Sequence, residues 1–544
     1  MSFSLPDYSI PTSIQLSDIF GLIGLFIFVL ATLTLAEILR RKEKVSGSTS
    51  RKIVHLAVGN VVIIFPFVFS SIWYALIGPV FFIPFTYFTC PASPVKKFRL
   101  KGVEAGHTYG TVFYAISLTI LTSLFFSPDA SNQNNIILIG SFLPLVWGDG
   151  IGAVIGSKFG NDKAYKIFGG TKTLLGSWAA AFATFISVTL GCLILFQSLE
   201  SVEVCIYIGL LSGFVTAFIE ALTPKGFDNI AVPLVNAIVL FGLYNLFHQN
   251  LKNLNEELSI ISIIIAAVVG LIIAILSIIF KALTWDGAIA GFYFGIVILG
   301  LGSWTWGVMY FTFFILGSLS SFIGKKKKES ISQEYEKGDT ARDSVQAMVN
   351  SIIPAIMSFL IVLIRNEPII IIIGAGAIAV SLADTLGTEL GALSRKEPHL
   401  SIKPWIKVPR GTPGAISLLG IISSIIGSTI IAIIGIGIAQ VDKFVKLKLL
   451  NSLLVLPSTI WLFVIPIIVG GTMGAYIDSI SACTIQKMNK CIICGKITEK
   501  KEHCQEKTIY HSGIKWIRND FVNLFSIILG SIISLLCYLI ATCF

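Results

Sequence analysis

Residues 17–39 read SDIFGLIGLFIFVLATLTLAEIL, and the basic residues Arg40, Arg41 and Lys42 follow directly. This run is long enough to cross a hydrocarbon core about 30 Å thick as a helix. It is too long for the apolar core of a signal peptide, and basic residues stand where a small-residue cleavage site would be expected. The sequence therefore predicts a permanent transmembrane helix near the start of the chain.

Similar apolar runs recur along all 544 residues, of which 54% are hydrophobic and 13% charged. A soluble domain carries about twice that charged fraction, so this class is excluded. The runs lack the alternating pattern of a membrane β-barrel, and helices satisfy their own backbone hydrogen bonds in lipid. We predict an all-α polytopic membrane protein with about sixteen helices, at about residues 17–39, 53–70, 72–90, 108–126, 135–156, 174–198, 204–222, 231–247, 258–280, 286–300, 304–323, 345–364, 368–390, 413–437, 454–480 and 521–543.

The net charge is +10, from 40 Lys and Arg against 30 Asp and Glu. In a soluble protein this would suggest nucleic-acid binding, but in a membrane protein basic residues gather on the cytoplasmic side. With the N-terminus outside and sixteen crossings, one face receives every Lys and Arg except Lys252, Arg365, Lys443, Lys446 and Lys448. We expect that face to be cytoplasmic and both termini to lie outside. Because the chain has no transit-like leader, we expect a prokaryotic plasma membrane.

The polar segment 248–257, HQNLKNLNEE, separates eight predicted helices from eight more and is typical of a linker. The two halves do not align convincingly, so a fusion of different domains is favoured over an internal repeat. The predicted domains are residues 1–250 and 258–544. The second includes a polar cytoplasmic loop at 483–518.

In the first half, polar residues gather at the predicted cytoplasmic ends of helices. A carboxylate such as Asp149 is costly in hydrocarbon, so it should face a bundle interior, a cation or a metal. Asp149 and Asp228 suit Mg²⁺ held together with substrate phosphates, and Lys158 and Lys172 would supply positive charge for a polyphosphate. This pattern indicates a nucleotide site at the cytoplasmic membrane surface.

Simpler interpretations of several of these residues stay open. Gly148 and Gly150 would let a nucleotide approach the backbone, but their spacing also serves helix packing in membranes. Lys158 alone is also typical of a membrane-surface anchor. His55 is a candidate general base for an alcohol, because histidine titrates near neutrality, although a lone histidine after two basic residues is more often an interfacial residue.

Four motifs between about residues 50 and 240 resemble, in order, the phytol kinase branch of the dolichol kinase and CDP-lipid synthase superfamily. They are RKIVH at 51–55, GDG at 148–150 with GSKFG at 156–160, KT at 172–173 with GS at 176–177, and Glu220 with FDNIAVP at 227–233. The resemblance implies phosphorylation of a membrane-dissolved isoprenoid alcohol, such as phytol or geranylgeraniol, by CTP with Mg²⁺. It implies catalytic roles for Asp149, Asp228 and His55. It further implies nucleotide or phosphate binding by Gly148, Gly150, Lys158, Lys172, Thr173 and Asn229, and substrate contact by Glu220.

In the second half, Asp384 and Glu389 lie five positions apart beside glycines. On a regular helix they would point about 140° apart, so they share one ion only if the helix breaks, and otherwise each meets a different partner. The turn KVPRGTPGAIS at 407–417 follows, with Arg410 at its centre and Thr412 expected to open the next helix. It predicts a phosphate cradle of helix-terminal N–H groups and a guanidinium, or alternatively a tight interfacial turn whose arginine meets lipid headgroups.

From about residue 260 onward the chain resembles the phytyl-phosphate kinase family. The matching motifs are WDGAxAG at 285–291, RDSVQAxVN at 342–350, DT at 384–385 with ELG at 389–391, PRGTxGxxS at 409–417, GG at 470–471 with DS at 478–479, and NDxVN at 519–523. The similarity implies addition of a second phosphate to a prenyl monophosphate, with Asp384, Glu389 and Arg410 in catalysis. It implies phosphate binding by Gly411, Thr412, Gly414, Asn519, Asp520 and Asn523, and substrate contact by Asp286, Gln346, Asn350 and Asp478.

Of the nine cysteines, Cys491, Cys494 and Cys504 lie close together within the predicted loop 483–518. Cys491 and Cys494 form a Cys-x-x-Cys pair, and Cys504 follows His503. These four soft ligands suit a tetrahedral zinc ion, and the cytosolic side argues against a disulfide. Adjacent ligands at 503 and 504 are sterically awkward, so His511 is an alternative ligand, and a reduced loop without metal is the other interpretation.

Taken together, these patterns predict a bifunctional membrane isoprenoid kinase that converts a prenol to its monophosphate and then to its diphosphate, in isoprenoid salvage. Fusion would raise the effective concentration of the intermediate, and phosphoryl transfer needs no covalent nucleophile. A lipid-phosphate cytidylyltransferase is an alternative with the same donor. A transporter or flippase is another, although a carrier needs a midplane site and the polar motifs gather on one face. We expect no nucleic-acid partner.

Overall fold

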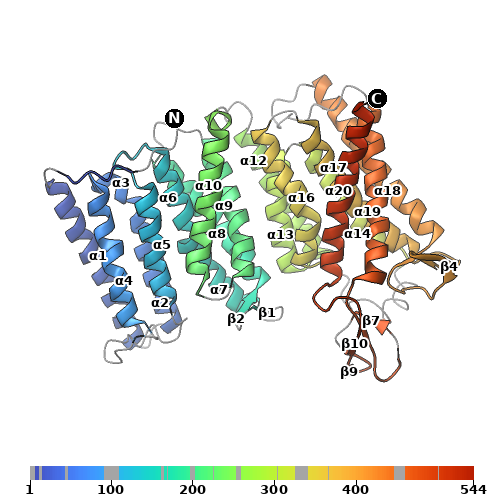
Figure 1. The fold of residues 1–544 in the computed structure, drawn as a ribbon, viewed down its shortest axis with the longest axis horizontal. Helices are drawn as coiled ribbons and strands as arrows, with labels where there is room; N and C mark the ends of the chain where they lie inside the picture. The colour runs from blue at the N-terminus through green and yellow to red at the C-terminus, as the bar shows by residue number, and fades with distance from the viewer. Residues whose placement is uncertain are drawn as a thin grey trace. The chain divides into compact units, whose positions relative to one another are not determined.

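The computed structural model describes residues 6–11, 15–42, 47–90, 93, 109–160, 164–167, 170–195, 202–223, 226–252, 259–302, 304–324, 341–364, 367–445, 460–495, 497–499 and 502–543. Within these ranges, 14 helices are long and apolar enough to cross a membrane, and shorter apolar helices cover residues 52–63 and 110–125. The chain is therefore an all-α polytopic membrane protein, as predicted (Figure 1).

The chain forms two compact units, Met1–Asn255 and Glu256–Phe544. The division falls within the polar segment 248–257 that separates the two sets of predicted helices. The basic clusters 96–101 and 325–328, which contributed to the predicted orientation, lie outside the described residues.

The first unit consists of helices and one β-hairpin. Its elements are α1 (Leu16–Arg41), α2 (Gly47–Gly59), η1 (Asn60–Ile63), α3 (Phe65–Val68), α4 (Ile72–Thr89), α5 (Gly110–Phe125), α6 (Gln133–Leu143), η3 (Pro144–Asp149), α7 (Gly150–Phe159), β1 (Ala164–Ile167), β2 (Gly170–Thr173), α8 (Leu174–Leu195), α9 (Val202–Leu222) and α10 (Asp228–Lys252). The predicted single helix at 53–70 is wrong, because three short segments, α2, η1 and α3, follow one another there. Pro66, which has no backbone N–H to donate, lies at the start of α3.

The burial of its side chains identifies α6 as the central helix of the first unit. Every residue of α6 from Asn134 to Leu143 is buried, and the chain continues into the π-helical segment η3, which ends at Asp149. By contrast, α1 exposes large apolar side chains such as Ile19, Phe20 and Ile27, as expected of a lipid-facing helix. The fold therefore carries Asp149 on its most enclosed element.

The second unit has the same general construction. Its helices are α12 (Ile260–Ile279), α13 (Trp285–Gly295), the π-helical η5 (Ile296–Gly302), α14 (Trp304–Phe322), α16 (Ser344–Leu363), α17 (Pro368–Gly391), α18 (Leu418–Val445), α19 (Trp461–Thr484) and α20 (Asn519–Cys543). The central helix is α17, whose side chains from Ile370 to Ala383 are almost all buried. Small residues allow its neighbours to approach closely, since a Cβ at Gly427 would lie 3.2 Å from the Ala383 backbone.

Short strands occupy the connections in the second unit, and they were not predicted. They are β3 (His399–Leu400), β4 (Lys403–Lys407), β5 (Ala415–Ile416), β6 (Met488–Lys490), β7 (Ile497–Thr498), β8 (Glu502–His503), β9 (Glu506–Lys507) and β10 (Ile509–Ser512). The sheet orders are β4-β3-β5, β10-β6-β7 and β8-β9, and all pairings are antiparallel. Figure 1 shows β7, β9 and β10 beyond one end of α19 and α20.

Candidate active sites

Three carboxylates from separate parts of the first unit meet at one point. Asp149 ends η3, Glu220 lies in the last turn of α9, and Asp228 begins α10. One oxygen of each carboxylate lies within 4.8 Å of the others. Among the described residues, Glu220 Oε2 is buried and has no hydrogen-bond partner. Carboxylate oxygens are the donors that Mg²⁺ prefers, so this acidic triad is the candidate cation site of the first unit.

Lys172 lies inside the acidic triad. Its Nζ is 2.7 Å from Glu220 Oε1 and 2.8 Å from Asp228 Oδ2, and its side chain is buried. Burial by itself lowers the pKa of Lys172, but the charges of Glu220 and Asp228 outweigh that effect and the pKa is raised. Lys172 is therefore charged at neutral pH and holds two carboxylates together. The sequence predicted phosphate binding for Lys172 and substrate contact for Glu220, and neither prediction anticipated this ion pair.

Local backbone geometry holds these side chains in position. Thr173, the last residue of β2, accepts a hydrogen bond from Gly176 N at 3.2 Å through Oγ1 and so supports the first turn of α8. Asp228 Oδ1 accepts from the backbone N–H groups of Gly226 and Asn229, at 2.9 and 3.1 Å. Gly226 has φ +92°, a left-handed conformation that favours glycine. Asn229 in turn donates from Nδ2 to Gly110 O at 2.9 Å.

His55 borders the acidic triad. Its Nε2 lies 2.9 Å from Leu145 O and 3.9 Å from Asp149 Oδ2. Because a carbonyl oxygen only accepts, Nε2 carries the proton in the first contact, which leaves Nδ1 as the basic nitrogen of neutral His55. The Tyr114 ring packs edge-on against the imidazole, with centroids 4.7 Å apart, and its hydroxyl donates to His55 O at 3.2 Å. The imidazole is thus fixed beside the triad.

The predicted glycines serve helix packing in this structure. A Cβ at Gly148 would lie 2.6 Å from Thr184 Oγ1, and one at Gly150 would lie 3.0 Å from Leu56 Cδ2. Neighbouring side chains thus pack directly against the Cα atoms of Gly148 and Gly150, as expected if these glycines serve helix packing. Lys158 is exposed, with its Nζ 5.2 Å from the Phe159 ring centroid. A nucleotide role for these three residues stays a prediction.

The central cation of the second unit is Arg342, which precedes α16. Its guanidinium lies over the Phe313 ring of α14, with Cζ 5.5 Å from the centroid. Burial lowers the pKa of Arg342, and the charges of Glu389 and Asp384 oppose that shift. Glu389 Oε1 also accepts a hydrogen bond from Ser321 Oγ at 3.0 Å. Asp384 and Glu389 both lie on α17, which is continuous there, and the charges of both interact with the Arg342 guanidinium.

Arg342 belongs to the RDSVQAxVN motif, but the sequence did not predict a site role for it. The signal that could have found it is the intramembrane pair Asp384 and Glu389. Two carboxylates at the end of a buried helix require a cation from another element, and Arg342 is the arginine of a motif that opens a neighbouring helix.

Asp286 holds the chain segment that carries Arg342. Its Oδ2 accepts from Ser344 Oγ at 2.8 Å and Ser344 N at 3.2 Å, while Oδ1 accepts from Thr284 Oγ1 at 2.7 Å. The backbone of Arg342 is held by the same segment, because Thr284 N donates to Arg342 O at 3.0 Å. Asp286 thus ties the start of α13 to the start of α16 and positions Arg342.

The other predicted polar residues of α16 lie on its first turns. Asp343 caps this helix by accepting from Gln346 N at 3.1 Å. Asn350 donates from Nδ2 to Gln346 O at 2.7 Å. Substrate contact by Gln346 and Asn350 stays a prediction.

A second polar contact joins α19 to α20. Asp478 Oδ1 accepts from Ser526 Oγ at 3.1 Å, and the Asn523 amide, oriented to suit its neighbours, places its nitrogen 3.0 Å from the same oxygen. Asn519 and Asp520 form the first turn of α20, and phosphate binding by these residues and by Asn523 stays a prediction. Asp478 and Asp384 are close enough for their charges to interact. The acidic residues of α17 and α19 therefore belong to one region of the second unit.

The predicted phosphate cradle around Arg410 differs from the expectation. Thr412 does not open a helix, because α18 begins at Leu418 and strand β5 intervenes. Gly411 and Gly414, at φ +83° and +74°, turn the chain back instead, and Thr412 Oγ1 donates to Pro409 O at 2.7 Å. No helix begins at Thr412, so this residue does not present helix-terminal N–H groups to a phosphate.

Arg410 itself reaches the segment that follows α17. Its Nη2 donates to Arg395 O at 2.8 Å. The interfacial-turn interpretation fits this arrangement better, and phosphate binding by Arg410, Gly411, Thr412 and Gly414 stays a prediction.

The loop between α19 and α20 gathers a third cluster. One ligand atom from each of Cys491, Cys494, His503 and Cys504 lies within 4.8 Å of the others. A backbone hydrogen bond from Cys494 is the main reason that the pKa of Cys491 is lowered to about 6. Desolvation raises the pKa of Cys504 to about 11. The four residues predicted as metal ligands are thus brought together.

Fold and polar clusters define a polytopic helical membrane protein with acidic and basic groups at helix ends. Residues 268–531 match the family described as integral membrane protein DUF92. A phytol kinase of Synechocystis sp. is 30% identical over 220 residues, which cover 39% of this chain and 86% of that protein. The chain therefore belongs to the phytol kinase family, in agreement with the resemblance of its motifs.

Two further relatives support this placement. Protein PGR of Arabidopsis thaliana is 28% identical over 289 residues, which cover 50% of this chain and 94% of that protein. A probable chloroplastic phytol kinase 2 of Oryza sativa is 28% identical over 232 residues, which cover 39% of this chain and 71% of that protein. No solved structure matches the chain.

Proposed function

We propose that this chain is a bifunctional membrane isoprenoid kinase. The first unit phosphorylates a prenol, phytol or geranylgeraniol, with CTP, and the second unit phosphorylates the resulting monophosphate. Membership of the phytol kinase family supports kinase chemistry on an isoprenoid alcohol. The observation that carries the proposal is the acidic triad with Lys172, because phosphoryl transfer depends on positioning and charge neutralisation.

In the first unit, Asp149, Glu220 and Asp228 would hold Mg²⁺, which neutralises charge on the nucleotide phosphates when it is bound. Lys172 fixes the spacing of Glu220 and Asp228. His55 Nδ1 accepts the proton of the alcohol, because its Nε2 already donates to the backbone. The alcohol oxygen forms a bond to the γ-phosphorus of CTP, the bond from that phosphorus to the bridging oxygen breaks, and CDP leaves.

In the second unit, Arg342 provides the positive charge. A guanidinium can bind two oxygens of one phosphate group, and this geometry suits a prenyl monophosphate. Asp384 and Glu389 orient Arg342 from α17. A phosphate oxygen of the monophosphate attacks the γ-phosphorus of a second CTP, so that CDP leaves and a prenyl diphosphate forms. We place this salvage chemistry at the cytoplasmic face of the membrane, on the distribution of Lys and Arg.

Labelled CTP tests the proposal and separates it from its main rival. Membranes containing the protein are supplied with geranylgeraniol or, in parallel, with a lipid phosphate, together with Mg²⁺ and CTP labelled at either the α- or the γ-phosphate. A kinase transfers the γ-label to the lipid and leaves the α-label in CDP. Transfer of the α-label would instead establish a cytidylyltransferase, which needs a lipid phosphate rather than a free alcohol.

A matched pair of variants assigns the activity to the acidic triad. Asp149→Asn removes one carboxylate of the triad and should abolish labelling of the alcohol. Asp129→Asn changes an exposed aspartate in the turn before α6 and should leave labelling intact. Equal activity of the two variants would show that the triad is not the site of transfer.

A further inference from the structure

The connection between α19 and α20 has little apolar core of its own. Its strands β6 to β10 are two to four residues long. Ile492, Ile493 and Trp516 are 63%, 62% and 67% exposed, while Met488 and Ile517 are among the few buried apolar side chains. Folded segments below about 40 residues usually need a metal or disulfides, because they bury too little apolar surface. This loop therefore needs an additional cross-link to hold one conformation.

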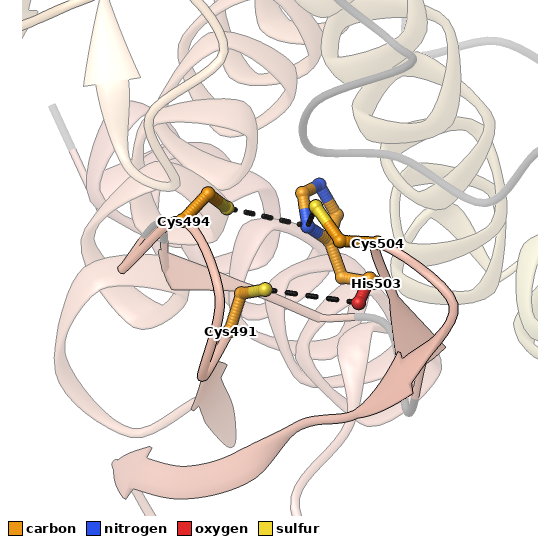
Figure 2. Close-up of side chains that lie close together, drawn as sticks. All are labelled: Cys491, Cys494, His503 and Cys504. Carbon is orange, nitrogen blue, oxygen red and sulfur yellow. Dashed lines mark hydrogen bonds between the residues drawn. The ribbon is translucent and has the colours of Figure 1, made fainter.

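The four clustered side chains have the spacing of a tetrahedral metal site. Figure 2 shows Cys491 and Cys494 on one side of the loop, facing His503 and Cys504 on the other. His503 Nδ1 lies 3.4 Å from Cys494 Sγ and 3.1 Å from Cys504 Sγ. Around zinc, bond lengths of about 2.3 Å to sulfur and 2.0 Å to nitrogen place neighbouring ligand atoms roughly 3.5 to 3.8 Å apart. The two nitrogen–sulfur distances lie within about half an ångström of this spacing, and all four ligand atoms lie within 4.8 Å of one another.

The backbone explains how adjacent residues can both be ligands. His503 ends β8, and the turn to β9 passes through Cys504 and Gln505 at φ 53° and 65°. This left-handed turn brings the Cys504 thiol back toward the His503 ring, which a regular strand would not do because its side chains alternate between faces. It removes the steric objection to the pair, so His511, on β10, is not needed as a replacement.

The first pair of ligands also lies on a tight turn. Gly495 N donates to Cys491 O at 3.1 Å, and Gly495 has φ +73°. Non-glycine residues in the left-handed region, such as Cys504 and Gln505, cost free energy that the rest of the structure must offset. A metal bond to Cys504, in the turn between β8 and β9, would offset this cost.

We infer that Cys491, Cys494, His503 and Cys504 bind one zinc ion, which holds the α19–α20 connection in its folded form. The site is independent of the proposed kinase function. The ends of the loop are joined by backbone hydrogen bonds, from Lys487 N to Ile517 O at 2.8 Å and from Ile514 N to Ile485 O at 2.9 Å. The metal therefore stabilises the segment that leads into the first turn of α20.

Metal content of the purified full-length protein tests the inference directly. After dialysis against metal-free buffer, the wild type should retain about one zinc per chain by elemental analysis, and replacement by Co²⁺ should give the visible absorption of a tetrahedral thiolate site. Cys491→Ser and Cys504→Ser should each lose most of the metal. Cys543→Ser, which changes an exposed cysteine outside the cluster, should retain it. No bound metal in the wild type, or equal loss in all three variants, would overturn the inference.

Chelation of the wild type provides a readout that does not depend on a variant folding. Zinc removal should increase tryptic cleavage at the exposed Lys490, Lys507 and Lys515 several-fold, and added zinc should restore resistance. Cleavage unaffected by chelation would contradict a structural metal. Cysteines of the loop that resist alkylation until a reductant is added would indicate a disulfide in its place.

Discussion

At the scale of single residues, one cation in each unit interacts with two carboxylates. Lys172 does so in the first unit through direct ion pairs, and Arg342 does so in the second through the charges of α17. A buried ion pair is weak evidence for stability, but removal of one partner leaves an uncompensated charge and is strongly unfavourable. These cations are therefore the most informative positions to change.

Lys172→Met should lower labelling of the alcohol at least about 100-fold, because Glu220 and Asp228 would then repel each other without a shared cation. Lys172→Arg keeps the charge and should retain part of the activity. Initial rates with γ-labelled CTP measure both. Wild-type rates in Lys172→Met would show that the ion pair has no part in transfer.

The raised pKa of Lys172 also predicts how stability depends on pH. A lysine whose folded pKa exceeds its unfolded value of about 10.4 contributes its full stability below that pH and loses it as the pH rises further. Thermal unfolding in detergent should therefore lose a Lys172-dependent increment only above about pH 10. The difference between wild type and Lys172→Met should shrink there, and a difference that stays constant to pH 12 would contradict the assignment.

Arg342→Lys should slow the second phosphorylation about 10- to 100-fold while sparing the first. Lysine keeps the charge but cannot bind a phosphate through two parallel hydrogen bonds, so the loss measures that geometry. Formation of diphosphate from supplied geranylgeranyl monophosphate is the measurement. Lys396→Arg serves as the control, because it also exchanges one basic residue for another but lies outside the cluster of Arg342, Asp384 and Glu389.

At the scale of elements, hydropathy predicted the helices well because lipid leaves few alternatives to them. It could not predict where side chains from different helices meet. The predicted topology places Lys172, Glu220 and Asp228 at the same membrane face, but their spacing does not indicate that β2, α9 and α10 bring them within ion-pair distance. The start of α18 was also mispredicted, because Thr412 was expected to open the helix and the left-handed Gly411 and Gly414 form a turn instead.

Close packing between α7 and α8 predicts that a larger side chain at their contact lowers the stability of the first unit. A Cβ at Gly152 would lie 2.7 Å from Gly176 O and 2.8 Å from Ala180 Cβ, so Gly152→Val should destabilise the first unit by about 1–3 kcal/mol. Ala153→Val changes the exposed neighbour on the same helix and should be nearly neutral. Thermal unfolding of the two variants in detergent compares them. Equal melting temperatures would show that the helices can separate without cost.

At the scale of the whole molecule, two compact units in one chain fit two consecutive reactions on one lipid. Tethering keeps the monophosphate near the second site, so less of it is lost to the surrounding membrane. The sequence predicted the division at the polar segment 248–257, because polar residues interrupt the apolar runs there. It could not predict Arg342 as the centre of the second site, since that role depends on contacts between α14, α16 and α17.

The most direct test of the two-step account separates the reactions in the full-length protein. Wild type, Asp149→Asn and Asp384→Asn are supplied with γ-labelled CTP and Mg²⁺, together with either geranylgeraniol or its monophosphate, and the labelled lipids are resolved. We predict that Asp149→Asn makes no product from the alcohol but still converts the monophosphate to the diphosphate, whereas Asp384→Asn stops at the monophosphate. Loss of both steps in either folded variant, or a diphosphate formed by Asp384→Asn at the wild-type rate, would contradict the account.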